Sequence, residues 1–106
     1  MKPRQAAPLF AALGDATRLA IVRQLCDQGP RSIVQLTRAA QVSRQAVSKH
    51  LRALQSAGLV RGERLGRECI WEIRQQRLGE ARRYLQEISD HWDSALRRLR
   101  AMLESH

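Results

Sequence analysis

The stretch SRQAVSKHLRALQSAGLV, residues 43–60, decides how the rest of this chain can fold. Ser43 is a good N-cap, because its hydroxyl can accept a hydrogen bond from a free backbone N–H of the first helical turn. Gly58 suits the residue just beyond a helix, because glycine readily adopts the left-handed conformation that ends many helices. Apolar residues at spacings of four and three form one buried stripe, which consists of Val47, Leu51 and Leu54. We therefore predict a single helix with a defined start and end.

The other face of this predicted helix carries hydrogen-bond donors of several lengths and no acidic residue, which suits the major groove of DNA. These residues are Arg44, Gln45, Ser48, Lys49, Arg52 and Gln55. Gln45 can pair with adenine through two hydrogen bonds and Arg44 with guanine, each pair contributing about 1–3 kcal/mol of discrimination. Lys49 and Arg52 lie further along the helix, so we expect them to hold phosphates.

The positive charge of the chain is concentrated on the segment that holds this helix. The net charge is +9, and all but two of the 19 basic residues are arginines. Residues 31–62 contain six basic residues and no Asp or Glu, whereas residues 78–106 contain five of each sign. Because the guanidinium fork suits phosphates and guanine edges, this distribution favours a nucleic-acid partner over a merely soluble basic protein.

Two helices are predicted ahead of this region. Residues 6–13 form a short helical candidate with Pro8 in its first turn, where a missing N–H costs little, and Gly14 ends it. Asp15 can cap the second helix, and the Gly-Pro pair at residues 29–30 stops it. The residues expected on its inward side are Leu19, Val22 and Cys26, with Ile21 and Leu25 next to them.

A third predicted helix follows Ser32 and leads through a short turn into the helix at Ser43. Its expected inward residues are Ile33, Leu36 and Ala40. Two helices joined by three or four residues, the second one basic and polar outward, are typical of a helix-turn-helix motif, which we assign to residues 32–57.

After that motif the apolar period changes from 3.6 to 2, which predicts two strands, at residues 59–64 and 68–74, around a glycine turn. Together they form a basic hairpin, residues 59–74, which we call the wing. Arg64 and Arg67 lie near its tip, where they can reach phosphates or an adjacent minor groove.

The last segment, residues 77–104, carries a sustained heptad seam. Its seam residues alternate between spacings of three and four: Leu78, Ala81, Leu85, Ile88, Trp92, Ala95, Leu99 and Met102. No earlier element is long enough to cover a helix of about 40 Å. We therefore expect it to pair with a copy of itself, with help from residues 6–13, instead of packing only on its own domain. The residues expected at this dimer interface are Leu9, Phe10, Leu85, Ile88, Trp92, Ala95, Leu99 and Met102.

The expected fold is mainly α with a small β-hairpin: a winged helix-turn-helix with a long C-terminal dimerisation helix, in one domain of residues 1–106. Two cysteines are too few for a disulfide scaffold, and neither a signal peptide nor a membrane span is evident, so we expect a cytoplasmic protein. No Gly-rich phosphate loop, Ser-His-Asp order or paired-carboxylate site points to an enzyme. A protein-interaction module built on the heptad helix would explain the seam but not the acid-free basic stretch.

Three stretches resemble the ArsR/SmtB family of bacterial winged-helix repressors. They are LFAALGDATRLAIVRQL at residues 9–25, QVSRQAVSKHLRALQSAGLV at residues 41–60 and GERLGRECIWEI at residues 62–73. The resemblance covers nearly the whole chain. It implies a homodimer, joined through its first and last helices, that binds a near-palindromic operator and represses transcription until a signal releases it. It also implies that the start of the recognition helix reads bases, which points to Ser43, Arg44, Gln45 and Ser48.

The metal sites common in this family do not match the residues here. A Cys-x-Cys pair ahead of the recognition helix would fall on Ser32 and Val34, and no second histidine follows His91 at the family's spacing. We therefore predict neither a bound metal nor a cofactor. The alternative is a metal- or redox-responsive sensor of the same fold that uses Cys or His residues. Cys26 and Cys69 lie on apolar stripes, so we expect buried, inert thiols.

Overall fold

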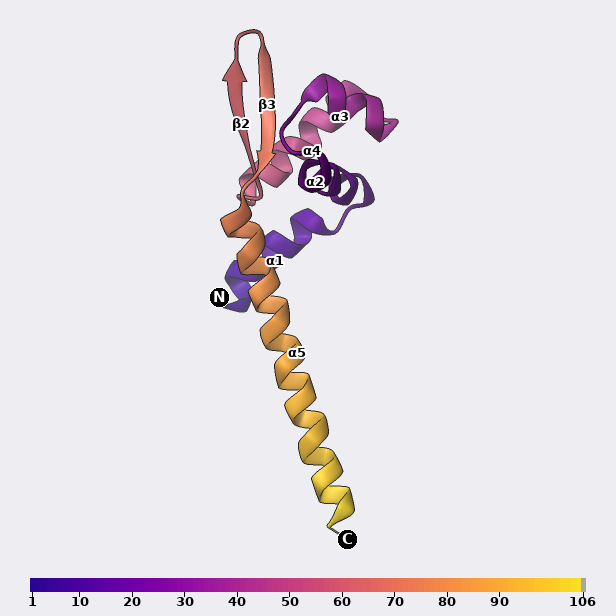
Figure 1. The fold of residues 1–106 in the computed structure, drawn as a ribbon, viewed down its shortest axis with the longest axis vertical. Coiled ribbons are helices and arrows are strands. Elements are labelled where there is room, and N and C mark those ends of the chain that lie inside the picture. Colours follow the sequence, from indigo (N-terminus) through magenta and orange to yellow (C-terminus); the bar gives the residue numbers. More distant parts are fainter. Residues whose placement is uncertain (106) are drawn as a thin grey trace.

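The structure, a computed structural model, describes residues 1–105 as a small helical body from which one long helix projects (Figure 1). Its elements are α1 (Pro3–Leu13), α2 (Ala16–Gln28), β1 (Arg31–Ser32), α3 (Ile33–Ala40), α4 (Arg44–Ser56), β2 (Val60–Leu65), β3 (Glu68–Ile73) and α5 (Gln75–Glu104). The molecule measures 70 × 25 × 23 Å. Its radius of gyration of 18.4 Å exceeds the roughly 13 Å of a compact chain of this length, because α5 extends far beyond the body.

Side-chain caps start three of the four short helices of the body, α2, α3 and α4. The capping residues are Asp15, Ser32 and Ser43, and each accepts a hydrogen bond from the backbone N–H three residues later, at 2.9, 3.2 and 3.1 Å. At the end of α4, Gly58 has a φ of 78°, and the backbone N–H of Leu59 donates to the carbonyl of Leu54 at 3.0 Å. The predicted caps and the predicted end at Gly58 are confirmed.

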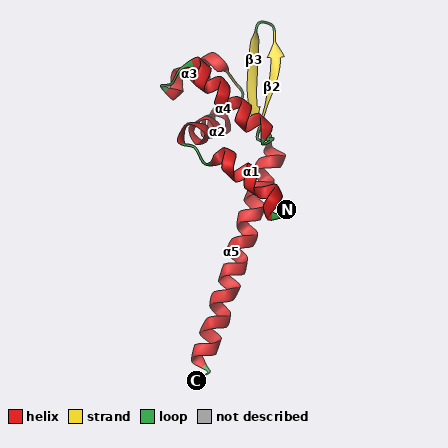
Figure 2. Cartoon of the chain, turned by 180° about the vertical axis from the view of Figure 1, so that it is seen from behind, coloured by secondary structure: helices red, strands yellow, loops and turns green. Residues whose placement is uncertain are grey.

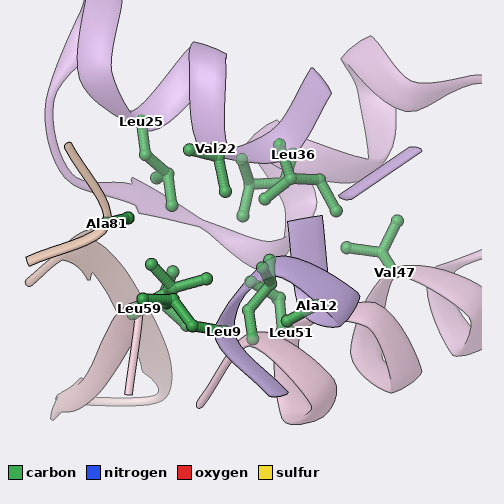
Figure 3. Close-up of a cluster of buried hydrophobic side chains, with 12 residues drawn as sticks. Leu9, Ala12, Val22, Leu25, Leu36, Val47, Leu51, Leu59 and Ala81 are labelled. Carbon is green, nitrogen blue, oxygen red and sulfur yellow. The ribbon is translucent and has the colours of Figure 1, made fainter. Parts of the chain in front are cut away.

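The core of the body lies between the four short helices and the hairpin (Figure 3). Val47, Leu51 and Leu54 of α4 are completely buried, which confirms the predicted inward stripe. From α5, Ala81 enters this core, and both views of the chain show α1 lying against the first half of α5 (Figure 2). None of the helices in residues 1–105 is both long and apolar enough to cross a membrane.

The sheet has three antiparallel strands in the order β1-β3-β2. The hairpin of β2 and β3 matches the predicted wing, with each strand shifted by no more than one residue. The two-residue strand β1 pairs with β3 through Arg31 opposite Trp71 and Ser32 opposite Ile70. Strand β1 is not predicted from the sequence, because two residues are too few to produce a period and the pairing depends on a strand that comes much later in the chain.

Two predictions about the first helices are wrong. Helix α1 begins at Pro3, so Pro8 lies inside the helix and not in its first turn. In α2 the inward face consists of Ile21, Val22 and Leu25, whereas Leu19 and Cys26 are exposed. The reason is that α2 carries two overlapping apolar stripes, and the neighbouring elements cover only one of them.

Candidate nucleic-acid interface

Helix α4 presents its polar face to solvent as a shallow hollow of about 540 Å³. The hollow is lined by Arg44, Gln45, Ser48, Lys49 and Arg52. Because the opposite side of α4 is fixed in the core by three completely buried side chains, this face cannot turn inward. The structure therefore brings together five of the six α4 residues predicted on this face, all except Gln55, and Ser43 lies beside them as the cap of the same helix.

A second groove, of about 320 Å³, lies between the wing, the start of α3 and the start of α4. We call it the arginine groove. Its lining residues are Ser32, Ile33, Val34, Arg44, Arg64, Arg67, Glu68, Cys69 and Trp71. Three arginines, one from α4 and two from the wing, thus line one groove with a single acidic residue, which leaves the lining with a net positive charge. The sequence predicts Arg44 on the helix at Ser43 and the other two arginines in the wing, but no local pattern indicates that they line one groove.

The opposite face of the wing has a different charge balance. Arg61 and Glu72 stand opposite each other in the β2–β3 register, and the Arg61 Nε donates to Glu72 Oε1 at 3.0 Å. This hydrogen bond and the carboxylate charge raise the pKa of Arg61. Arg61 therefore already has an anionic partner, whereas Arg44, Arg64 and Arg67 form no salt bridge within residues 1–105.

A polar cluster connects α4 to the first two helices. Arg18 donates through Nε to the carbonyl of Ala12 at 2.6 Å, and its Nη1 lies 3.3 Å from Nδ1 of His50. The carboxylate of Asp15 lies 3.9 Å from the same His50 nitrogen. The backbone N–H of Arg18 lowers the pKa of Asp15, and the nearby His50 and Arg18 side chains add to this effect. His50 thus anchors the inner side of α4, away from its exposed polar face.

The far part of α5 exposes most of its predicted seam. Exposed fractions are 54% for Leu85, 51% for Ile88, 64% for Trp92, 51% for Leu99 and 65% for Met102, whereas Ala95 is partly buried.

Near the start of α5 the chain covers its own seam in part. The Phe10 ring packs on Tyr84 with ring centroids 5.9 Å apart, and an apolar groove of about 490 Å³ lies between Phe10, Leu78 and Leu85. Leu9, which we expected at the dimer interface, is completely buried in the core of its own chain. That expectation is wrong, because α1 turns Leu9 inward and leaves Phe10 at its edge.

The two cysteines are free thiols in different settings. Cys26 is exposed on α2, and Cys69 is partly buried on β3, so the expectation of two buried thiols is wrong for Cys26. Within residues 1–105, no three His, Cys, Asp or Glu side chains are grouped closely enough to hold a metal ion.

Comparisons with known proteins agree with one another on the family. The family model described as "Bacterial regulatory protein, arsR family" matches residues 15–61, from the cap of α2 into β2. The transcriptional repressor SmtB of Mycobacterium tuberculosis is 41% identical over 68 residues, which cover 64% of this chain and 50% of that protein. The chain thus spans about half the length of this curated relative.

Two solved structures extend the likeness beyond the matched segment. An ArsR-like transcriptional regulator from Rhodococcus sp. RHA1 superposes with a TM-score of 0.81 at 36% identity, covering 93% of this chain and 92% of that chain. The winged helix-turn-helix DNA-binding domain Mb0332 from Mycobacterium bovis, described as homodimeric, superposes with a TM-score of 0.68 at 29% identity, covering 82% of this chain and 80% of that chain.

Proposed function

Because this chain belongs to the ArsR/SmtB family of winged helix-turn-helix transcriptional regulators, we propose that it is a homodimeric repressor that binds a near-palindromic DNA operator. In this proposal α4 is the recognition helix and lies in the major groove. The wing contacts the DNA backbone or the adjacent minor groove.

The observation that carries the proposal is the arginine groove. Arg44, Arg64 and Arg67 line one groove, and an anion bound in that groove would be attracted by all three cations. A phosphate of the DNA backbone is such an anion, and arginine can bind it through two hydrogen bonds at once. A phosphate held here would orient α4 and the wing on the same stretch of duplex.

Base reading is assigned to the first half of α4. Ser43, Arg44, Gln45 and Ser48 occupy its first turns, and Gln45 and Arg44 suit adenine and guanine respectively. Lys49 and Arg52 lie further along the same hollow, so we assign them to phosphates. The first group sets sequence preference, and the second raises affinity for any duplex.

The homodimer is supported by the exposed seam of α5. Its large apolar side chains from Leu85 to Met102 are more than half exposed in the single chain, and an apolar surface of this extent is typical of an interface. We assign Phe10 to its edge and Leu85, Ile88, Trp92, Ala95, Leu99 and Met102 to its centre. A two-fold dimer then requires two half-sites about 34 Å apart, one helical turn of DNA.

Fluorescence anisotropy with DNA from upstream of the protein's own gene tests the proposal. A scrambled duplex of equal length is the control, at one stated salt concentration, because phosphate contacts make affinity steeply salt-dependent. We expect the native duplex to bind far more tightly than the scrambled one. The double variant Arg44→Ala/Gln45→Ala should lose this preference.

A matched variant separates base reading from charge. Arg23→Ala/Gln24→Ala removes one cation and one amide from the exposed side of α2, and Arg23 is paired with Asp27 there. It should keep the preference for the native duplex. Equal binding of both duplexes by the unmodified protein would refute specific regulation through α4.

A further inference from the structure

The start of α5 is fastened directly to the end of α4. The Nε of Arg77 donates to the carbonyl of Ala57, the residue that ends α4, at 3.0 Å. Its Nη1 pairs with Glu80 Oε2 at 2.6 Å, and the Arg77 side chain is only 30% exposed. The stem of Arg77 also lies across Gly58, where an added Cβ would stand 3.5–3.7 Å from it.

These interactions hold the Arg77 side chain in one orientation between α4 and α5. The last carbonyls of a helix lack partners within the helix, and a cation is favoured there by the helix dipole. A guanidinium can use one edge for Ala57 while Glu80 holds the other, which fixes its orientation in a way a lysine ammonium cannot. A second hydrogen bond runs from the backbone N–H of Arg74 to the carbonyl of Leu59, at 2.9 Å.

We propose that Arg77 is a positioning residue that couples the self-association helix α5 to the recognition helix α4. This inference rests on the proposed function. Arg77 holds the C-terminal end of α4, whereas the base-reading residues occupy its other end, about 20 Å away along the 13-residue helix. A 10° swing of α4 about Ala57 would move those residues by about 3 Å, which is far more than a base-edge hydrogen bond tolerates.

In a two-fold dimer, the angle between α4 and α5 also sets the distance between the two recognition helices. The α5 helices pair with each other, so each α4 takes its place relative to the two-fold axis through its attachment to α5. The preferred spacing of half-sites on DNA therefore depends on the Arg77 link. A residue that merely contributed to stability would leave the spacing preference unchanged.

Half-site spacing provides the test. The probe is the palindromic duplex that the unmodified protein selects from a random pool, together with versions that carry one extra or one missing central base pair. Arg77→Met should weaken binding to the selected spacing about tenfold, the loss expected for one hydrogen bond from a charged group. Its affinities for the three duplexes should also differ less from one another than those of the unmodified protein do.

Two matched variants control for charge and for chemistry. Arg83→Met removes the same charge from the same helix, where Arg77 and Arg83 line a common pocket beside the start of α1. Arg83 makes no hydrogen bond to α4 in the described part of the chain, so the spacing preference of this variant should be unchanged. Arg77→Lys keeps the charge and one donor and should restore part of the preference. If Arg77→Met unfolds, Glu80→Gln replaces it, because it removes the carboxylate charge that holds one edge of the guanidinium and leaves the bond to Ala57.

Two results would overturn the inference. One is a spacing preference that stays the same in Arg77→Met, or in Glu80→Gln where it replaces that variant. The other is a salt slope that falls by about one in Arg77→Met, since that marks a lost phosphate contact. Sedimentation must show the same dimer for the variants and the unmodified protein. If the unmodified protein prefers no duplex over its scrambled version, the proposed function itself has failed.

Discussion

Helix α4 and the far half of α5 carry the same apolar spacing of three and four residues, but they differ in what covers it. The stripe of α4 is completely buried, whereas Ile88, Trp92 and Leu99 on α5 are 51–64% exposed. Periodicity therefore tells which side of a helix is apolar, and only the arrangement of the other elements tells whether the chain itself can cover that side. Where it cannot, the same pattern indicates an interface.

The short helices and α5 also differ in how they begin. Helices α2, α3 and α4 start with a side-chain cap, whereas α5 follows Arg74, which makes no side-chain cap hydrogen bond in the described structure. Helix α5 is 30 residues long, and its far half has little tertiary packing within the chain. Most helical stability in proteins comes from such packing, so we expect the far half of α5 to be stabilised by association.

The largest expected effect comes from truncating the buried stripe. Leu51→Ala should lower the free energy of unfolding by about 2–5 kcal/mol, because it leaves a cavity in the centre of the core. Leu99→Ala is the matched change on α5 and, at concentrations where the protein is monomeric, should cost no more than about 0.5 kcal/mol. Urea unfolding at several protein concentrations measures both. Equal losses in the monomer would contradict the comparison.

Next in size is the effect of a charge on the exposed seam. Ile88→Glu should weaken dimerisation roughly a hundredfold or more, because two copies of Ile88 would leave the interface and each apolar side chain contributes about 1.5–3 kcal/mol. The body should keep its unfolding free energy. Sedimentation equilibrium measures the association, and Ala101→Glu, an exposed position off the seam, is the matched control. A dimer that survives Ile88→Glu would mean that α5 pairs through another face.

A smaller difference in stability is expected between a serine removed from the cap of α4 and a serine removed from the exposed part of α5. Ser43→Ala should cost about 1 kcal/mol, because the backbone N–H of Ala46 loses its acceptor. Ser94→Ala on α5 should change stability by no more than a few tenths of a kcal/mol, since its hydroxyl accepts a hydrogen bond from the exposed Arg97 side chain and caps no helix end. Thermal unfolding compares the two variants. If Ser94→Ala is the more damaging change, the far half of α5 has more structure of its own than we infer.

The smallest effect is a pH dependence at the cap of α2. The hydrogen bond from the Arg18 backbone lowers the pKa of Asp15 in the folded state, so its charge stabilises the fold above the ordinary carboxyl pKa and is lost as the pH falls through the lowered value. Asp15→Asn keeps an acceptor but does not titrate. The advantage of Asp15 should therefore be present near neutral pH and decline as the pH falls below about 4. Melting temperatures across this range measure it, and a constant difference would show that charge is not involved.

Much of the fold could be predicted because its signals are local. Ser43 and Gly58 mark the ends of α4 through their own backbone preferences, and the apolar stripe between them has one period. The wing follows from a change of period within a few residues. By contrast, β1 depends on pairing with β3, and the exposure of Cys26 depends on which of two stripes the other helices cover. No local pattern contains that information.

The candidate site likewise has one part that the sequence predicts and another that depends on the tertiary fold. The five α4 residues that line the hollow follow from one helical face, and the sequence predicts them together. The arginine groove does not follow from the sequence, because it requires the wing to fold back towards the start of α4, and neither does the bond from Arg77 to Ala57. Leu9 was misassigned to the interface for a related reason: a short apolar helix shows which residues are apolar but not which of them meets its own core.

The length of α5 also gives the molecule mechanical leverage. At 30 residues it is an arm of about 45 Å, anchored at its base where it meets α4. A positional tolerance of about 1 Å at the tip corresponds to an angular tolerance of only about 1° at the base, whereas an arm of ten residues would allow about 4°. Because α5 is long, ordinary side-chain packing at its tip fixes the direction of the helix at its base to within a small angle.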